Sequence, residues 1–451
     1  MGTPIANGES RLSFWPRVRK FAVPVSMIEI ATARRLAGDW AGACAAAGVD
    51  VDLDLRSLAR EFGRDVAGRV RDDLRFLAPD LLRWHMPRIA PDGLLRPGLT
   101  LALARYGGLG RGRPLYLVAR TPPAWADAGQ RISLALWGGA ASSLPFRHPH
   151  PRPNRRFRLD LHRHLWDARR AGELRIRAGG GTADDGPPPY GPRCAADRWG
   201  DEASLLLRAE GRSSGAVVVR LEGGRRLLLD VDSGDVEPVD RRLSELPLLP
   251  DAATWILPDL ELLRAGAIEA GRLHPLVAAA LVPEGPGAAQ PASATAAGAP
   301  RVVECRGARH RIGLVGGVLV PLDHSPDEIR REELLVALTG TPLPCLQAID
   351  DAHRHPECLP DVRERLSHGD FAGALAVVEG LLGPDAVLRN GALRDELETV
   401  ARRRIRYGLF RAGLIGSGPG SVVRHDGRRT RGGGSRRSLD HRARPRHASR
   451  P

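Results

Sequence analysis

LTLALARY (99–106), LYLVAR (115–120) and RISLALW (131–137) are three successive apolar runs, and the segments between them are rich in Gly, Arg and Pro. Runs of this length and composition, separated by turn residues, predict β-strands. Their close succession predicts that the three strands pair as an antiparallel meander. We expect this meander to lie in the first folded region of the chain, residues 27–177.

The segments on either side of the meander have different patterns. Over residues 27–86, apolar side chains recur mostly at intervals of three and four residues, as on one face of a helix. After the meander, RFRLDLHRHLWDARRAGEL (156–174) predicts a passage from a strand into a helix. Residues 1–26 are expected to be a loose leader, and residues 178–200, rich in Gly and Pro, a linker.

A second folded region is expected over residues 201–282. It contains SLLLRAE, AVVVRLEGG and RRLLLDVD (204–232), which predict a second β unit with a hairpin turn at Gly223-Gly224. Helices interrupted by prolines follow. Residues 283–300 are of low complexity, rich in Ala, Pro and Gly, and predict a flexible linker between domains.

The third folded region is expected over residues 301–414. Three short strand patterns (301–324) precede Ser325-Pro-Asp-Glu328, which has the form of a capping box with Pro at the first helical position. The pattern is helical from there, and residues 415–451 predict a disordered, Arg-rich tail. The predicted fold class is therefore α+β and multi-domain, with helical N-terminal and C-terminal regions and small antiparallel β units between them.

Two distant segments resemble each other. RLAGDWAGACAAAG (35–48) and RLSHGDFAGALAVVEG (365–380) share the order Gly, Asp, aromatic, Ala, Gly, Ala. Gly-Asp at this position predicts the end of one helix and the cap of the next, and the small residues allow the two helices to pack closely. We interpret the likeness as one packing solution used twice, or as a helical-hairpin module for binding partners.

Charge is distributed unevenly along the chain. The net charge is +14, but residues 401–451 alone contain 15 arginines against Asp426 and Asp440, so the first 400 residues are about neutral. Lys20 is the only lysine among 67 basic residues. Walker A nucleotide binding, protein-kinase chemistry and pyridoxal catalysis each need a lysine in a defined setting, and the sequence excludes all three.

The cysteines and the hydropathy pattern predict a cytoplasmic protein. Five cysteines are scattered without a C-x-x-C motif, which favours reduced thiols over a disulfide framework. No run of 18 apolar residues occurs, so no membrane span and no membrane partner are expected. No cofactor is predicted.

His162 and His164 form the first candidate metal site, in LDLHRHLWD (159–167). The string resembles the D-x-H-x-H-L segment of amidohydrolase-type metal enzymes, in which alternate histidines on a barrel strand bind one divalent metal. The resemblance covers about eight residues and implies a metal-dependent hydrolase. The chain lacks the lysine that bridges metals in that family and the β/α alternation of its barrel. The alternative is that His162 and His164 begin an exposed helix.

A second candidate metal site is Cys345, His353, His355 and Cys358. Two thiols and two imidazoles within 14 residues satisfy the ligand requirement of zinc. The spacing C-x7-H-x-H-x2-C matches no standard finger, and Cys345 is expected within a helix. The alternative interpretation is buried thiols beside a polar helix end.

A local basic patch is the candidate nucleic-acid contact. Residues 147–177 contain ten arginines and three acids, with Phe157 and Trp166 available to stack on bases. The arginines assigned to this contact are Arg152, Arg155, Arg156, Arg158 and Arg163. The alternative is a solvated loop in a chain that uses arginine throughout.

Longer segments resemble proteins of uncharacterised function from high-GC actinobacteria. These are IATARRLAGDW, DLLRWHMPRIAPDGLLRPG and FRLDLHRHLWDARRAGEL. The resemblance implies a bacterial cytosolic setting and adds no mechanism. The leading hypothesis is a non-enzymatic interaction or scaffold subunit of a bacterial multi-protein system, with other proteins of that system as partners. A nucleic-acid-associated protein using 147–177 and the tail is the first alternative, and the metal-dependent hydrolase is the second.

Overall fold

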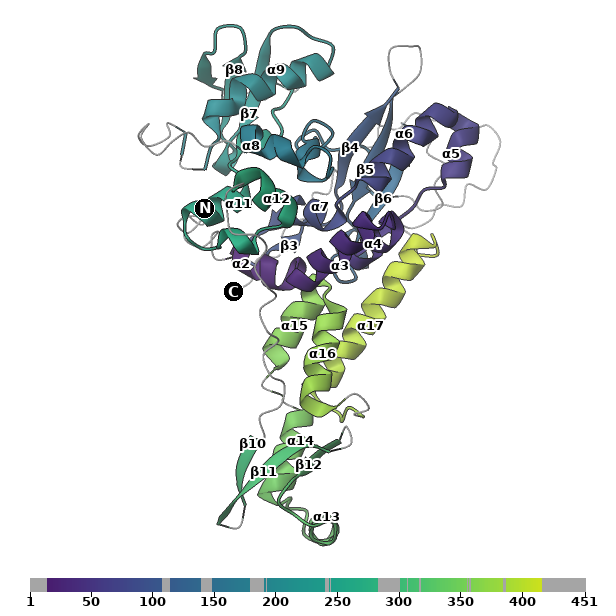
Figure 1. Cartoon of the computed structure of the whole chain (residues 1–451), viewed down its shortest axis with the longest axis vertical. Coiled ribbons are helices and arrows are strands. Elements are labelled where there is room, and N and C mark those ends of the chain that lie inside the picture. The colour runs from purple at the N-terminus through teal and green to yellow at the C-terminus, as the bar shows by residue number, and fades with distance from the viewer. Residues whose placement is uncertain are drawn as a thin grey trace, which may run out of the picture. The chain divides into compact units, whose positions relative to one another are not determined.

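A computed structural model of the chain confirms the α+β class, with helical N-terminal and C-terminal regions and small antiparallel sheets between them (Figure 1). All of the described residues belong to one compact unit, Met1–Ile415. The described ranges are 14–107, 114–138, 148–178, 190–191, 193–239, 243, 245–282, 301–305, 307–315, 318–354, 356, 358–383 and 387–415. The predicted linker 283–300, the first half of the predicted leader (1–13) and nearly all of the tail lie outside them. Residues 14–26 are not a loose leader, because residues 14–22 are helical and bury Phe14, Val18 and Ala22.

The predicted meander is confirmed. Its strands are β4 (Thr100–Tyr106), β5 (Leu115–Arg120) and β6 (Ile132–Trp137), and neighbouring strands pair antiparallel. A fourth strand, β1 (Val49–Val51), joins β6 in parallel and gives the order β1-β6-β5-β4. Strand β1 was not predicted, because three residues are too few to show the alternation of apolar and polar side chains that indicates a strand.

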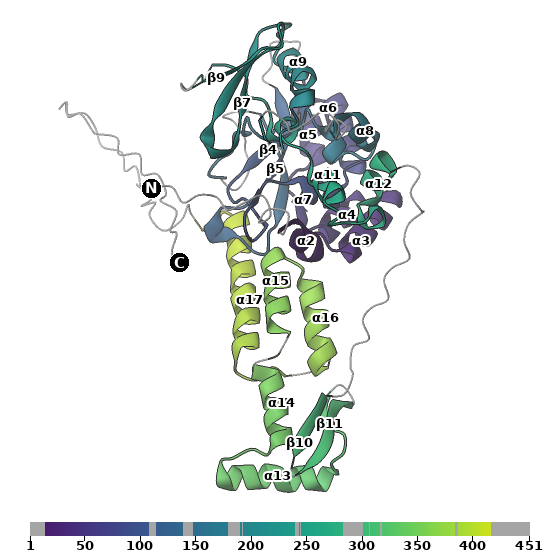
Figure 2. The same cartoon turned by 90° about the vertical axis from the view of Figure 1, so that its left-hand side faces the viewer.

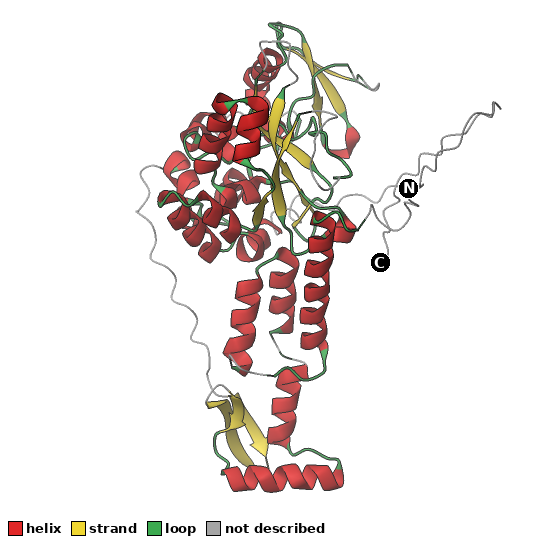
Figure 3. Ribbon diagram, turned by 90° about the vertical axis from the view of Figure 1, so that its right-hand side faces the viewer, coloured by secondary structure: helices red, strands yellow, loops and turns green. Residues whose placement is uncertain are grey.

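Helices of the N-terminal region pack on this sheet and build the largest hydrophobic core. Figure 3 shows them as the group of red helices beside the yellow strands. These helices are α4 (Trp40–Ala46), α5 (Leu55–Phe62), α6 (Arg64–Arg75) and α7 (Pro79–His85). Three further helices, α2 (Phe14–Arg17), the π-helical η1 (Val18–Ala22) and α3 (Val25–Leu36), bury their apolar side chains in a separate cluster with Trp84 and Leu262. A short pair of strands, β2 (Arg88–Ile89) and β3 (Leu94–Leu95), follows them. No described helix combines the length and the apolar character that a bilayer crossing requires.

Residues 156–174 contain no strand, and the predicted strand-to-helix passage is wrong. The chain there runs through turns into η3 (Arg163–Leu165), η4 (Ala171–Glu173) and α8 (Leu174–Arg177). Leu159, Leu165 and Trp166 are buried in the main core. The alternation that suggested a strand therefore reflects burial of irregular backbone against other elements.

The second β unit is only partly as predicted. SLLLRAE lies in helix α9 (Trp199–Ala209), preceded by η6 (Ala196–Arg198), and not in a strand. Its buried Ala203, Leu206 and Leu207 are spaced by three and four residues and pack against the neighbouring strands in a second hydrophobic cluster. A short apolar run does not by itself distinguish a buried strand from a buried helix.

The hairpin that follows α9 is confirmed. Strands β7 (Ala216–Arg220) and β8 (Arg226–Asp230) pair antiparallel, and β9 (Val236–Pro238) extends the sheet. The turn, η7 (Glu222–Gly224), has a φ of 69° at Gly223 and 83° at Gly224, values that favour glycine. Short helices then return to the main core: α10 (Asp251–Thr254), α11 (Pro258–Arg264), η8 (Ala270–Arg272) and α12 (Pro275–Leu281).

The C-terminal region begins with the three predicted strands. They are β10 (Arg301–Cys305), β11 (Ala308–Val315) and β12 (Val318–Pro321), in an antiparallel sheet. The predicted capping box is present at the start of α13 (Pro326–Thr339). Four helices follow it: α14 (Pro344–Arg354), α15 (Leu359–His368), α16 (Phe371–Leu382) and α17 (Ala392–Arg411). Figure 2 shows α15, α16 and α17 side by side.

The two similar segments form the same local structure. Asp39 accepts a hydrogen bond from the backbone N–H of Gly42 at 2.8 Å, and Asp370 accepts one from Gly373 at 2.9 Å. Each aspartate thus caps a helix, α4 or α16, that follows another helix closely. The likeness in sequence is therefore a likeness in capping and hairpin geometry.

Arg83 in α7 connects three separate parts of the chain. Its side chain is 1% exposed, and its guanidinium donates to the carbonyl oxygens of Ala22 (2.9 Å), Gln130 (2.6 Å) and His368 (2.7 Å). Burial lowers the pKa of Arg83 to about 10, so the group remains charged at neutral pH. These carbonyls lie in the N-terminal helices, before β6 and at the end of α15.

The end of α17 makes a second connection to the central sheet. Tyr407 donates its hydroxyl proton to Asp50 in β1 at 2.6 Å, and Arg411 pairs with Asp52. Arg131 also donates to Asp50, at 2.6 and 2.8 Å. Asp50 in β1 and Asp52 directly after it therefore hold the last helix.

Replacing Arg83 by methionine should destabilise the fold strongly. Methionine fills similar space but leaves three buried carbonyl groups without donors, so we expect a loss of about 3–5 kcal/mol in the free energy of unfolding. Urea denaturation measures it. The control is Arg402→Met, whose side chain is 73% exposed. Equal stability of the two variants would contradict the role given to Arg83.

Candidate functional site

The predicted nucleic-acid arginines are mostly committed to partners within the chain. Arg163 pairs with Asp73 and Asp167, and Arg158 bonds to Asp160 and Glu210. Arg156 bonds to Asp251 at 2.6 Å, and Arg155 donates to the carbonyl of Leu246. Arg152 is exposed. The five residues therefore do not form one free cationic surface.

His162 and His164 lie together but in a closed setting. His162 precedes the η3 turn and His164 lies within it, so the strand required for the hydrolase interpretation is absent there, and the exposed helix is absent too. Both side chains are 1% exposed, with ring centroids 5.8 Å apart. His162 Nε2 lies 3.1 Å from Glu202. Burial, then the neighbouring His162, lowers the pKa of His164 well below its usual range.

The predicted zinc cluster is not brought together around Cys345. Cys345 occupies the first turn of α14 and His353 its last turn, which are about 12 Å apart along a helix. Cys358 precedes α15, and His355 lies outside the described residues. The nearest metal-ligating side chains to Cys345 are Cys305 and His324.

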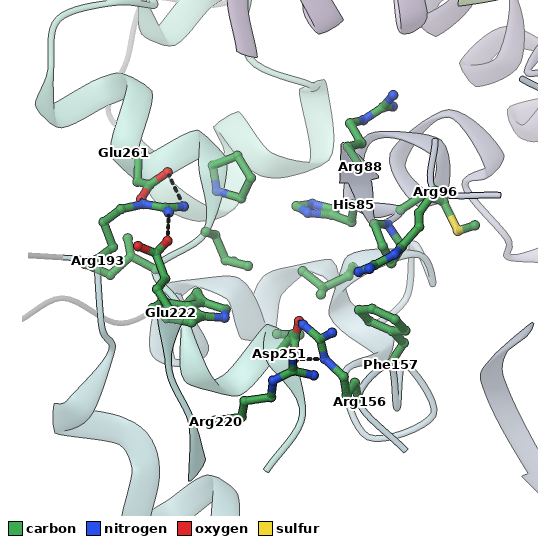
Figure 4. A pocket seen from close by; sticks show the side chains of 18 of the residues that line it. His85, Arg88, Arg96, Arg156, Phe157, Arg193, Arg220, Glu222, Asp251 and Glu261 are labelled. Carbon is green, nitrogen blue, oxygen red and sulfur yellow. Dashed lines mark hydrogen bonds and ion pairs between the residues drawn. The ribbon is translucent and has the colours of Figure 1, made fainter. Parts of the chain in front are cut away.

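The structure contains a cavity of about 550 Å³ that was not predicted from the sequence. Its volume falls within the roughly 300–1,000 Å³ usual for ligand pockets. Figure 4 shows arginines approaching it from several elements, including the segment after α7 and the β7–β8 hairpin. The arginines that line it are Arg88, Arg96, Arg156, Arg193 and Arg220.

Arg96 and Arg220 differ from the other arginines of the pocket. Arg156 is neutralised by Asp251, and Arg193 by Glu261 and Glu222. Among the described residues, the guanidinium groups of Arg96 and Arg220 make no hydrogen bond or ion pair. Burial and the like charge of Arg156 lower the pKa of Arg220, and the carboxylate of Asp251 partly offsets this effect. The pocket therefore has an excess of positive charge at these two groups.

Aromatic and apolar side chains form the rest of the wall. Arg156 lies over the ring of Phe157 at 5.1 Å, and Arg193 lies 5.9 Å from the ring of Trp255. Leucines of the main core, Leu101 and Leu159, also contribute. The arrangement suits a ligand that carries an anionic group on a partly apolar body, because guanidinium groups bind phosphate and carboxylate through paired donors.

Only Arg156 among the pocket's arginines belonged to a predicted site. Arg96 and Arg220 are 124 positions apart in the sequence, and neither lies in a motif. Their proximity depends on how the hairpin packs beside the segment that follows α7. No protein-family model, curated protein or solved structure matches the chain.

His85, at the edge of the pocket, should make stability depend on pH. Its side chain is 2% exposed and 3.8 Å from Asp259, and burial lowers its pKa to about 4 from 6.5. The folded state therefore keeps His85 neutral, whereas the unfolded chain takes up a proton below about pH 6.5. Stability contributed by this group is present above pH 6.5 and is lost as the pH falls towards 4.

The prediction concerns the difference between two variants, since carboxylates also titrate in this range. His85→Gln should lose less stability between pH 6.5 and 4 than the unmodified chain, measured by urea denaturation at each pH. His150→Gln, at an exposed position, serves as the control and should follow the unmodified chain. Identical pH profiles for all three proteins would show that His85 takes up a proton without unfolding.

Proposed function

We propose that the chain is a non-enzymatic interaction protein, one subunit of a bacterial multi-protein system, and that it holds an anionic group of its ligand in the arginine-lined pocket. The observation that carries the proposal is the pair Arg96 and Arg220. Both residues line the cavity, and their guanidinium groups have no partner among the described residues. Arg156 and Arg193 pair with carboxylates, and Arg88 donates to backbone carbonyl groups.

Keeping the half-buried guanidinium group of Arg220 near other cations costs free energy in the unliganded protein. Burial removes part of the water that would solvate Arg220, and repulsion from Arg156 adds to the cost. A bound anion offsets both penalties, and the exposed Arg96 supplies a second donor for it. A shifted charge that faces a cleft marks a candidate functional site.

Apolar side chains exposed on the C-terminal region support the interaction role. On α13, Leu334 is 62% exposed and Leu338 is 84% exposed, and on α17 Ile405 is 64% exposed. On the small sheet, Val315 and Val318 are each 56% exposed. Apolar side chains gathered on one element are characteristic of surfaces that contact other proteins.

The two alternatives gain less from the geometry. Nucleic-acid binding requires free cations that neutralise phosphates, and Arg155, Arg156, Arg158 and Arg163 already have partners. A hydrolytic metal requires an open position for water, and His162 and His164 are closed to solvent. The nucleic-acid alternative is a distinguishable outcome of the experiment below.

The proposal is tested by affinity capture of the full chain from its native lysate, with and without nuclease, followed by mass spectrometry. Arg96→Ala/Arg220→Ala is compared with Arg56→Ala/Arg403→Ala, which removes the same charge at exposed positions outside the pocket. We expect stoichiometric protein partners that survive nuclease with the unmodified chain and the control. The pocket variant should lose most of them, because the anionic group has no free donors left.

Partners retained equally by both variants would contradict the role of the pocket. Partners that disappear on nuclease treatment would instead favour the nucleic-acid alternative. Circular dichroism and the urea midpoint of each variant are needed beside the capture, so that unfolding is not mistaken for loss of binding.

A further inference from the structure

Three metal-ligating side chains meet where the small C-terminal sheet contacts its two helices. Cys305 is the last residue of β10, His324 immediately precedes the cap of α13, and Cys345 lies in the first turn of α14. One ligand atom from each lies within 4.8 Å of the others. Cys305 and Cys345 are buried, and the side chain of His324 is 8% exposed.

One ligand–ligand distance in this cluster matches the edge of a coordination tetrahedron. Ligands at the usual zinc–sulfur and zinc–nitrogen distances are roughly 3.5 Å apart across such an edge. The distance from Cys345 Sγ to His324 Nε2 is 3.5 Å. Two thiols and an imidazole are the ligand set preferred by zinc and other soft divalent cations.

Glu332 occupies the position of an outer partner for His324. His324 Nδ1, the ring nitrogen directed away from Cys345, lies 3.8 Å from Glu332 Oε1. Metal-binding histidines usually offer their second N–H to a carboxylate, which fixes the tautomer and the ring. Glu332 is 4% exposed, and its Oε2 has no hydrogen bond among the described residues. A buried carboxylate of this kind is costly unless positive charge lies nearby.

His310 in β11 lies against His324. Its ring stacks on His324 with centroids 4.3 Å apart and planes inclined by 27°. Its Nδ1 is also buried without a hydrogen bond in the described part of the chain. The cluster therefore has an additional imidazole next to it.

Residues 301–354 need more than their apolar core to hold one structure. Only a few of their apolar side chains are buried, among them Ile312 and Ile349, whereas Val302, Leu334 and Leu338 are more than half exposed. Regions with so small a core are commonly stabilised by a structural metal or by disulfides. A metal ion at the cluster would join the sheet to both helices at one point.

We propose that Cys305, His324 and Cys345 bind a divalent zinc-type cation, with Glu332 positioning His324. Binding releases the two thiol protons and leaves thiolates on the metal. The site shares only Cys345 with the cluster expected from the sequence, because α14 separates Cys345 from His353. It is independent of the arginine-lined pocket and of the ligand proposed for it.

The test is the metal content of the full chain, purified without chelator and without a polyhistidine tag. Mass spectrometry of the metals should find about one zinc ion per chain. Cys305→Ser and Cys345→Ser should each lose it, whereas Cys358→Ser, a cysteine of the expected cluster, should retain it. Retention of zinc by Cys345→Ser, or its loss from Cys358→Ser alone, would overturn the assignment.

A second measurement on the unmodified chain covers the case in which a serine variant does not fold. Cobalt added to metal-free protein should produce a thiolate-to-cobalt charge-transfer band, and zinc should protect Cys305 and Cys345 from alkylation. Absence of both effects in a protein that also purifies without zinc would refute the site. Recovery of a Cys305–Cys345 disulfide by non-reducing peptide mapping would do so as well.

The role of Glu332 is tested separately, by measuring zinc affinity. Glu332→Ala should weaken zinc affinity by roughly 10-fold or more in competition with a chromophoric chelator. Glu333→Ala, the exposed neighbour on α13, should leave the affinity unchanged. Equal affinities of the two variants would remove Glu332 from the site.

Discussion

The guanidinium group of Arg83 donates hydrogen bonds to carbonyl oxygens of the N-terminal helices, the segment before β6 and the end of α15. A cation that is 1% exposed is tolerated only when its donors are satisfied, so these carbonyl groups must hold fixed positions around it. The acceptor in the C-terminal region is 285 positions away from Arg83 in the sequence. One side chain thus requires helices, sheet and C-terminal bundle to fold in relation to each other.

The helix that carries Arg83 also positions part of the pocket. Trp84 donates its indole N–H to Asp259 at 2.9 Å, which ties α7 to α11. Arg88 donates to the carbonyl oxygen of Arg83 at 2.7 Å. His85 and Arg88 line the cavity from this side. The cavity wall is therefore continuous with the most constrained part of the core, and a preorganised wall lowers the entropic cost of binding a ligand.

Local patterns in the sequence predicted the elements whose signals are local. The strands around residues 99–137, the turn at Gly223-Gly224 and the capping box at Ser325 each depend on neighbouring residues, and each is present. The failures have a common cause. SLLLRAE is as apolar as a strand, and only its packing on the β7–β8 hairpin makes it a helix.

The candidate sites also depend on tertiary contacts that local sequence patterns do not contain. Cys345 was recognised as a potential ligand, but its neighbours were sought within 14 residues, whereas the side chains close to it come from β10 and from the loop before α13. Arg96 and Arg220 belong to no motif, and their meeting depends on the packing of separate elements. Adjacent residues alone do not predict either site, because each site is formed by tertiary contacts.

If Arg96 and Arg220 form an anion site, the full chain should bind inorganic pyrophosphate, which isothermal titration measures. At low ionic strength we expect saturable binding that weakens with added salt and is absent from Arg96→Ala/Arg220→Ala. Binding of equal strength by both proteins, or no binding by the unmodified chain, would contradict the anion site.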